Sequence, residues 1–172
     1  MTDSSDLDLL QALEYLGDAK SFAHRIYAMI GKIELFDGFE RAEIRLLSNF
    51  MHVYRAPPGA VLISEGRQGD HMMLLVDGSV EILKRDRYEN SKRIGTVEAG
   101  RTLGEMSMID GEPRFATCIA MESSTFAVLT RDDLARIIDE QPRLGAKILM
   151  ELVLMLSQRL RQTSTTLVNY LD

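Results

Sequence analysis

Apolar residues recur at three- and four-residue spacings through the first fifty residues, which is the period of an amphipathic helix. The runs LDLLQALEYL, FAHRIYAMIGKIELF and RAEIRLLSNF all follow this spacing. The pattern therefore predicts an N-terminal helical segment over residues 1–50. Two prolines and a glycine at positions 57–59 then mark a change to a different pattern.

Glycines and short apolar runs alternate from residue 59 to residue 130. The runs AVLIS, HMMLLV, SVEILK and TFAVLT are each of strand length, and turn residues separate them. This spacing predicts an all-β sandwich or barrel over residues 51–130. Asp77-Gly78 in LLVDGSVEIL predicts a tight hairpin. KRDRYENSKR predicts a longer, solvated hairpin loop, because its acidic and basic residues are interleaved.

Helical spacing returns over residues 131–172, the C-terminal segment. Thr130 and Asp133 have the spacing of a capping box, and Pro142 predicts the end of the helix that begins there. The sequence therefore predicts one short helix followed by one long helix.

Apolar residues on the long helix keep a heptad spacing for about three heptads, which is typical of a helix that pairs with a copy of itself. The members of this seam are Leu149, Val153, Leu156, Leu160, Leu167 and Tyr170. Thr163 takes the place of the missing member. A second stripe, formed by Ile148, Leu152 and Met155, is expected to pack back on the β-domain. The pattern predicts a homodimer formed through residues 144–171.

Charge and composition exclude several classes of protein. The formal net charge is −6 and the pI is near 5.1, whereas a general nucleic-acid binder usually carries a basic face. A single cysteine, Cys118, fits a reducing compartment, and the acidic N-terminus lacks the pattern of a signal peptide. The most apolar run, ILMELVLML, is too short to span a bilayer and contains Glu151. These features predict a cytoplasmic protein without a membrane segment.

The segment LGEMSMIDGEPRFAT, residues 103–117, interrupts the strand-like pattern. Gly104 allows a ligand to approach the backbone closely, and Arg114 is a planar cation suited to a phosphate. Glu105 would repel a bare phosphate, but it would accept a strong hydrogen bond from a hydroxyl on the same ligand. The combination favours a ribose phosphate. The alternative is that Glu105 and Arg114 only pair with each other across a surface loop.

An enzyme is not predicted. His24, His52 and His71 are isolated in the sequence, and no H-x-H, HExxH or cysteine cluster is present. His71 is expected in a solvated turn near the ligand site, and Cys118 is expected to be a buried structural thiol. We therefore expect no catalytic residues, no metal and no cofactor.

These motifs together resemble the phosphate-binding cassette of the cyclic-nucleotide-binding domain family. The matching residues read Gly-Glu-Met-Ser and Pro-Arg-Phe-Ala-Thr, and the likeness extends over roughly residues 35–170. The resemblance implies an eight-stranded β jelly roll with N-terminal helices and a long C-terminal helix. It implies that Glu105 accepts the ribose 2′-hydroxyl, that Arg114 holds the cyclic phosphate, and that backbone N–H groups complete the cradle. The implied ligand contacts in the cassette are Gly104, Glu105, Met106, Ser107, Arg114, Phe115 and Ala116.

The last helix, QRLRQTSTTLVNYLD, resembles the dimerisation helix of the catabolite activator branch of that family. In that branch a Thr-Ser pair meets the adenine at the dimer interface. Thr163 and Ser164 match the pair, and Arg159 matches a nearby arginine, so the resemblance implies that all three contact the ligand. The alternative is that Thr163 only sets the register of a coiled coil.

Two residues depart from the family pattern. Leu103 replaces a frequent phenylalanine, which is a change of packing. Phe115 replaces a small or hydroxyl-bearing residue, so lower affinity and no preference for guanine are expected. Its ring either covers the sugar or blocks the pocket.

The sequence thus predicts a stand-alone regulatory sensor that binds cyclic AMP, with cyclic GMP less favoured. It is expected to signal through its C-terminal helix to an unidentified protein partner. The family often carries a helix-turn-helix after this helix, but the sequence ends at Asp172, so direct DNA binding is not expected. The alternative prediction is a degenerate domain that serves as a dimeric scaffold without binding nucleotide.

Overall fold

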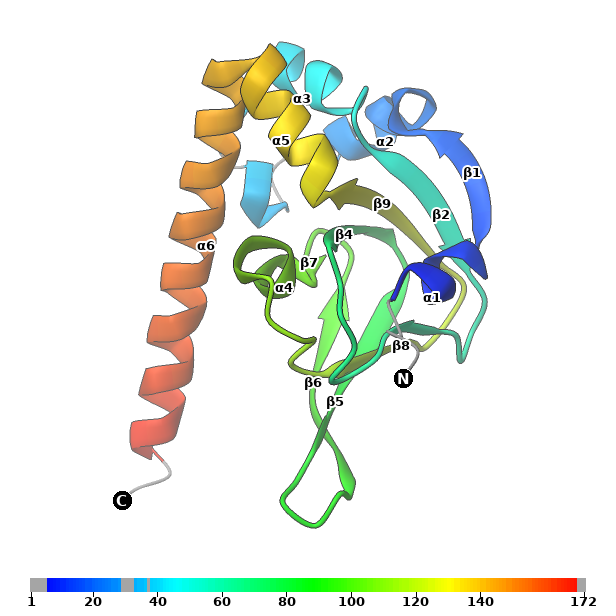
Figure 1. Cartoon of the computed structure of the whole chain (residues 1–172), viewed down its shortest axis with the longest axis vertical. Helices are drawn as coiled ribbons and strands as arrows, with labels where there is room; N and C mark the ends of the chain where they lie inside the picture. Colours follow the sequence, from blue (N-terminus) through cyan, green and yellow to red (C-terminus); the bar gives the residue numbers. More distant parts are fainter. Residues whose placement is uncertain (1–5, 29–32, 37, 170–172) are drawn as a thin grey trace.

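Two antiparallel β-sheets packed face to face form the body of the molecule (Figure 1). This computed structural model of the chain describes residues 6–28, 33–36 and 38–169. The five-stranded sheet has the order β1 (Glu14–Asp18), β2 (His52–Ala56), β9 (Ser124–Thr130), β4 (His71–Asp77) and β7 (Thr102–Leu103). The four-stranded sheet has the order β3 (Val61–Ile63), β8 (Thr117–Ala120), β5 (Ser79–Arg85) and β6 (Ser91–Glu98). The mainly β architecture predicted from the sequence is confirmed.

Strand β4 shows how the molecule builds two cores. Its side chains alternate between the sheet faces, so Met73 and Leu75 lie in the cluster between the two sheets. Met72, Leu74 and Val76 point the other way and join a second cluster beneath the helices. Because β4 is covered on both faces, its sequence is a continuous apolar run rather than an alternating one.

Helices cover the outer face of the five-stranded sheet (Figure 1). These helices are α2 (Ala23–Ala28), α3 (Arg41–Leu47), α5 (Arg131–Glu140) and α6 (Pro142–Asn169). Short 3₁₀ turns, η1 (Ala19–Phe22) and η3 (Glu34–Phe36), connect the N-terminal part. Helix α1 (Leu7–Gln11) lies apart from this layer, whereas α4 (Glu105–Asp110) contributes Met108 to the same cluster. Helix α6 runs down one side of the molecule (Figure 1).

The N-terminal segment is less helical than the sequence pattern predicts. Helix α1 ends at Gln11, and β1 then pairs with β2 at the edge of the five-stranded sheet. The Tyr15 ring packs on Tyr54, with ring centroids 5.3 Å apart. Pairing with a strand about forty residues away therefore overrides the helical spacing of LDLLQALEYL, and β1 raises the strand count above the eight that were expected.

The predicted tight hairpin at Asp77-Gly78 is wrong. Strand β4 pairs with β9 and β7, whereas β5 pairs with β6 and β8, so this turn carries the chain from one sheet to the other. Gly78 has a φ of 99°, and a Cβ there would lie 2.2 Å from the Ser124 hydroxyl. The glycine is therefore required by this crossing rather than by a hairpin.

The longer hairpin between β5 and β6 is confirmed. The Asp86 carboxylate accepts hydrogen bonds from the backbone N–H groups of Tyr88 and Asn90, at 2.8 and 3.1 Å. These bonds replace ladder hydrogen bonds at the tip, as expected for an aspartate in a turn.

The C-terminal segment forms one short and one long helix as predicted, and α5 ends at Glu140, just before Pro142. The Thr130 hydroxyl accepts a hydrogen bond from the Asp133 N–H at 3.0 Å, and α6 begins at Pro142. The second stripe, Ile148, Leu152 and Met155, is buried against the β-domain as expected. None of the described helices combines the length and hydrophobicity needed to cross a bilayer.

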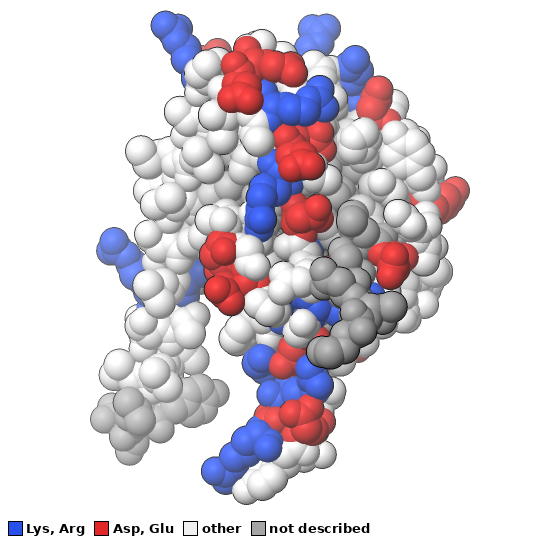
Figure 2. Space-filling view, viewed as in Figure 1, with Lys and Arg blue, Asp and Glu red and all other residues white. Residues whose placement is uncertain are grey.

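The heptad seam of α6 faces outward. Leu149, Val153, Leu160 and Leu167 are exposed, and Leu156 is half-buried. Tyr170, the last predicted member, and the end of the predicted dimerisation segment lie outside the described residues. On the face seen in Figure 2, most of α6 is free of charged side chains.

Candidate functional site

The segment that interrupts the strand pattern forms a short helix beside a buried arginine. Gly104 precedes α4 with a φ of 78°, in the left-handed region. A Cβ at this position would lie 2.5 Å from Arg114 Nη1 and 3.0 Å from the His71 carbonyl oxygen. Only glycine fits here, because any side chain would push the arginine away and strain the backbone.

Arg114 is held by three hydrogen bonds. Its Nε donates to Asp6 Oδ2 at 2.7 Å, its Nη1 to the Gly104 carbonyl at 2.7 Å, and its Nη2 to the His71 carbonyl at 2.9 Å. The residue is only 2% exposed. The planar fork is therefore fixed in one orientation by its own segment and by two distant parts of the chain, at Asp6 and His71.

Glu105, the first residue of α4, is also buried, at 4% exposure. Its Oε1 forms a short salt bridge with Arg159 of α6, and Arg159 Nη2 also donates to Thr102 Oγ1 at 3.2 Å. Its other oxygen, Oε2, is buried without a hydrogen-bond partner among the described residues. Burial raises the pKa of the Glu105 carboxyl above its ordinary value, and the charge of Arg159 opposes that rise.

Glu105 and Arg114 do not form the surface ion pair considered as an alternative. Glu105 forms its salt bridge with Arg159, and Arg114 forms its salt bridge with Asp6. Since both side chains are buried, these contacts belong to the interior rather than to a solvated loop.

The other predicted cassette residues take different positions. Ser107 and Ala116 are buried, whereas Met106 is about half exposed on α4. Arg131 donates to the carbonyls of Ser107 and Met108, at 2.6 and 2.7 Å, and so satisfies the C-terminal end of this short helix. Ser107 and Ala116 therefore support the cassette from inside, and Met106 presents its side chain outward.

Phe115 extends away from the interior, with 57% of its surface exposed. The Lys84 ammonium lies 4.5 Å from the ring centroid and donates to the Phe115 carbonyl at 2.8 Å. The same ammonium donates to Glu65 at 2.7 Å. In this arrangement the ring packs against Lys84 of β5.

A groove of about 480 Å³ opens between the four-stranded sheet and α6. Thr102, Arg159 and Gln162 line it on one side, and Ile82 and Val97 line it on the other. Because Arg159 also contacts Glu105, the groove and the buried carboxylate meet at this arginine. Most of the other lining residues are polar or charged, so the groove offers hydrogen-bonding groups beside the apolar Ile82 and Val97.

Thr163 and Ser164 lie one turn beyond Arg159 on the exposed part of α6. The Thr163 hydroxyl donates to the Arg159 carbonyl at 2.9 Å within the helix. The single chain therefore brings Arg159 to the cassette, but it leaves Thr163 and Ser164 facing solvent.

His71 and Cys118 both lie in the interior of the molecule. His71 is the first residue of β4 and fully buried, so the expected solvated turn is wrong. Burial lowers the pKa of the His71 ring, and the charge of Arg114 lowers it further. Cys118 is buried as expected, and burial raises its pKa to about 12. Within the described ranges, no three His, Cys, Asp or Glu side chains gather to hold a metal ion.

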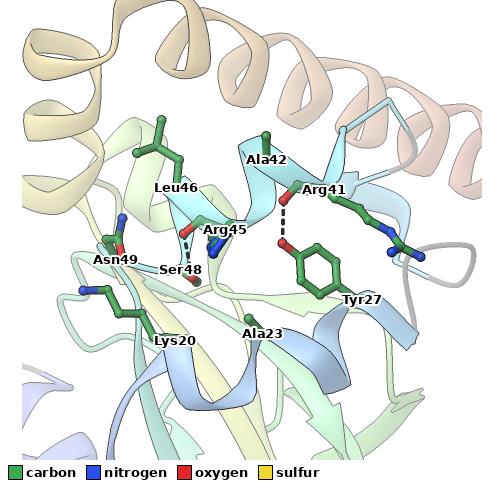
Figure 3. Close-up of a pocket in the computed structure, with 9 residues that line it drawn as sticks. All are labelled: Lys20, Ala23, Tyr27, Arg41, Ala42, Arg45, Leu46, Ser48 and Asn49. Carbon is green, nitrogen blue, oxygen red and sulfur yellow. Dashed lines mark hydrogen bonds between the residues drawn. The ribbon is translucent and has the colours of Figure 1, made fainter.

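A second hollow, of about 870 Å³, lies between η1, α2 and α3 (Figure 3). Lys20, Arg41 and Arg45 line it, and the Tyr27 hydroxyl donates to the Arg41 carbonyl at 2.5 Å. None of the predicted ligand-binding residues contributes to it. Its size alone does not connect it to the cassette chemistry.

The sequence did not indicate Asp6 or Thr102 as parts of the site. Asp6 lies 108 residues from Arg114 in the chain, and Thr102 lies 57 residues from Arg159. A buried aspartate leaves no local pattern, so only the tertiary structure could reveal these partners.

Known proteins resemble this chain in sequence and in structure. Residues 53–141, just over half of the chain, match the family described as the cyclic nucleotide-binding domain. A cyclic nucleotide-binding domain from Methylobacillus flagellatus KT is 36% identical with a TM-score of 0.85, covering 96% of this chain and 94% of that one. The catabolite activator protein of Thermus thermophilus is 25% identical with a TM-score of 0.71, covering 78% of this chain and 61% of that one.

Longer proteins are also related. The CRP-like cAMP-activated global transcriptional regulator of Mycobacterium tuberculosis is 23% identical over 141 residues, which is 82% of this chain and 61% of that protein. A cGMP-dependent protein kinase of Plasmodium berghei is 29% identical over 104 residues, 60% of this chain but 12% of the kinase. The chain thus spans less than two thirds of these relatives. The match over residues 53–141, the jelly-roll sandwich and the cassette around Glu105 and Arg114 lead to one conclusion, that the chain belongs to the cyclic-nucleotide-binding domain family.

Proposed function

We propose that the chain is a regulatory sensor that binds a 3′,5′-cyclic nucleotide between α4 and α6, with cyclic AMP as the ligand. The observation that carries the proposal is the buried Glu105 carboxylate, whose Oε2 has no partner in the described part of the chain. A buried acceptor without a donor is unfavourable by about 1–3 kcal/mol. A ribose 2′-hydroxyl would supply the missing donor.

Arg114 supports the phosphate end of this proposal. A guanidinium has five N–H donors, and the three hydrogen bonds described above leave donors for a cyclic phosphate. Its orientation is already fixed, so little side-chain entropy would be lost on binding. Gly104 keeps the backbone between the two charged residues free of a side chain.

The choice of cyclic AMP over cyclic GMP rests on the base side of the site. Position 115 carries no hydroxyl, and a hydroxyl there is associated with guanine preference in the family. Ile82 and Val97 offer apolar contacts to a purine within a groove whose other lining residues are mostly polar. The related mycobacterial regulator is named for activation by cyclic AMP, which is consistent with this choice.

The output of the sensor is proposed to pass through α6. Arg159 of this helix binds Oε1 of Glu105, so a ligand hydroxyl at Oε2 would share the same carboxylate and connect the ligand to α6. The exposed seam at Val153, Leu160 and Leu167 is suited to a second copy of the chain, which would also bring a partner surface to Thr163. Signalling requires that the ligand bind the two arrangements of α6 with different affinity.

Calorimetric titration with cyclic AMP and then cyclic GMP tests the proposal. Saturable binding of cyclic AMP at about micromolar affinity, near −8 kcal/mol, is the expected result. The Glu105→Gln variant should bind more weakly by about 1.5–3 kcal/mol, since it loses a hydrogen bond to a charged acceptor. Glu112→Gln changes an exposed carboxylate in the same loop and should bind normally. An absence of heat with both nucleotides would refute the proposal and favour the dimeric scaffold.

A further inference from the structure

The Asp6 carboxylate forms a salt bridge with Arg114 of the cassette and is fully buried. Its Oδ2 accepts the Arg114 Nε hydrogen bond at 2.7 Å, and its Oδ1 accepts one from the Ser64 N–H at 3.3 Å. The Asp6 backbone N–H donates to the Gln68 carbonyl at 2.9 Å. Both charged side chains are at most 1% exposed. The Asp6 carboxylate is therefore already paired with Arg114, the cation that would bind a cyclic phosphate under the proposed function.

The segment that carries this carboxylate is attached to the sandwich at few points. We call residues 6–13 the N-terminal arm. Beyond Asp6, its one buried side chain among those described is Leu10, which enters the core between the sheets, and Leu13 is half-buried. Asp8, at the start of α1, is exposed. A five-residue helix with so few buried contacts belongs to the least stable elements of a fold.

An anionic ligand and Asp6 would compete for the same charge. A cyclic phosphate carries one negative charge, as the Asp6 carboxylate does, and Arg114 carries one positive charge. If both anions stayed, they would repel each other in a buried site where screening by water is weak. If Asp6 left, the arm would lose its polar anchor at Ser64 and Arg114. In either case the bound arm lowers the affinity for the ligand.

We propose, building on the proposed function, that Asp6 is an intramolecular competitor for the ligand and that binding of cyclic nucleotide releases the N-terminal arm. The coupling is reciprocal: a closed arm weakens ligand binding by the same factor by which ligand weakens arm docking. The arm is then a second element that responds to the ligand, on the side of the sandwich away from α6 (Figure 1).

The test compares cyclic AMP affinity in the full chain for three proteins: wild type, Asp6→Asn and the matched control Asp8→Asn. Asp6→Asn keeps the shape of the side chain and one acceptor oxygen, but it removes the charge and replaces the second acceptor with an NH2 donor. We therefore expect roughly tenfold tighter binding, within the usual range of coupled sites. Asp8→Asn removes a charge from the exposed side of the same arm and should bind like wild type.

Hydrogen exchange on the wild-type protein gives a second readout that needs no variant. Amides in residues 6–13 should exchange faster when cyclic AMP is saturating, since the Asp6 N–H then loses the Gln68 carbonyl. The proposal would be overturned if Asp6→Asn bound cyclic AMP no more tightly than wild type. It would also be overturned if the arm amides stayed equally protected with ligand. Either result would show that Asp6 positions Arg114. Binding by Asp6→Asn alone would support it strongly. Binding by neither protein would overturn the proposed function itself.

Discussion

Truncation of Arg114 should destabilise the folded chain far more than truncation of a surface arginine. Asp6 is fully buried in the folded chain, and in Arg114→Ala a docked arm would leave its carboxylate with the Ser64 N–H at 3.3 Å as the remaining described donor. Removing one partner of a buried ion pair costs about 3–5 kcal/mol, because the other charge is left uncompensated. The Gly104 and His71 carbonyls lose a donor as well. We therefore expect a loss of at least about 3 kcal/mol.

A double-mutant cycle separates the uncompensated charge from the lost packing. Asp6→Ala in the Arg114→Ala background removes the stranded carboxylate, so the double variant should be less destabilised than the sum of the two singles. The coupling should fall at the upper end of about 0.5–3 kcal/mol. Urea unfolding followed by circular dichroism gives the free energies, provided that the transition is two-state.

The surface pair between Arg25 and Asp77 is the matched control. Its side chains are 40% and 64% exposed, so Arg25→Ala should change the free energy of unfolding by no more than about 1 kcal/mol. A loss below about 1 kcal/mol for Arg114→Ala, or singles that add within about 0.5 kcal/mol, would refute the description of Asp6 and Arg114 as a coupled buried pair.

Three further predictions concern other parts of the molecule. Burial raises the pKa of Cys118 to about 12, so the thiol should react with Ellman's reagent only after unfolding; prompt reaction of native protein would contradict this. Burial lowers the pKa of His71, so the unfolded chain binds the proton more readily, and the free energy of unfolding should fall as pH decreases below 6.5. That dependence should shrink in His71→Gln, and an unchanged slope would count against it. Leu160, 68% exposed on the seam, should be essential for self-association, so Leu160→Glu should sediment as a monomer while Gln158→Glu, on the opposite side of α6, behaves like wild type.

Local chemistry explains which parts of the structure could be predicted from the sequence. The Thr130 cap, the end of α5 before Pro142 and the buried stripe of α6 each depend on residues within a few positions of one another. The choice of Glu105 and Arg114 rested on the same kind of local argument, and both proved to be buried charged residues.

Long-range pairing explains most of what the sequence could not show. The Asp77-Gly78 turn has the composition of a hairpin, but the neighbouring strands find better partners in β9 and β8. Likewise, nothing near Asp6 in the sequence distinguishes it from the other acidic residues of the N-terminus. Its role follows only from the position of Arg114 in the folded chain.

The part of α6 that follows Arg159 has a thermodynamic consequence of its own. Side chains 160–168 are all exposed, so in a single chain this stretch gains no burial of its own. An isolated helix of this length is marginal in water. If a second copy covers these turns, association and helix ordering become one process, which would appear as a strongly negative heat-capacity change on dimerisation. Rearrangement of one ion pair at Glu105 could then alter the strength of assembly while the β-sandwich itself stays unchanged.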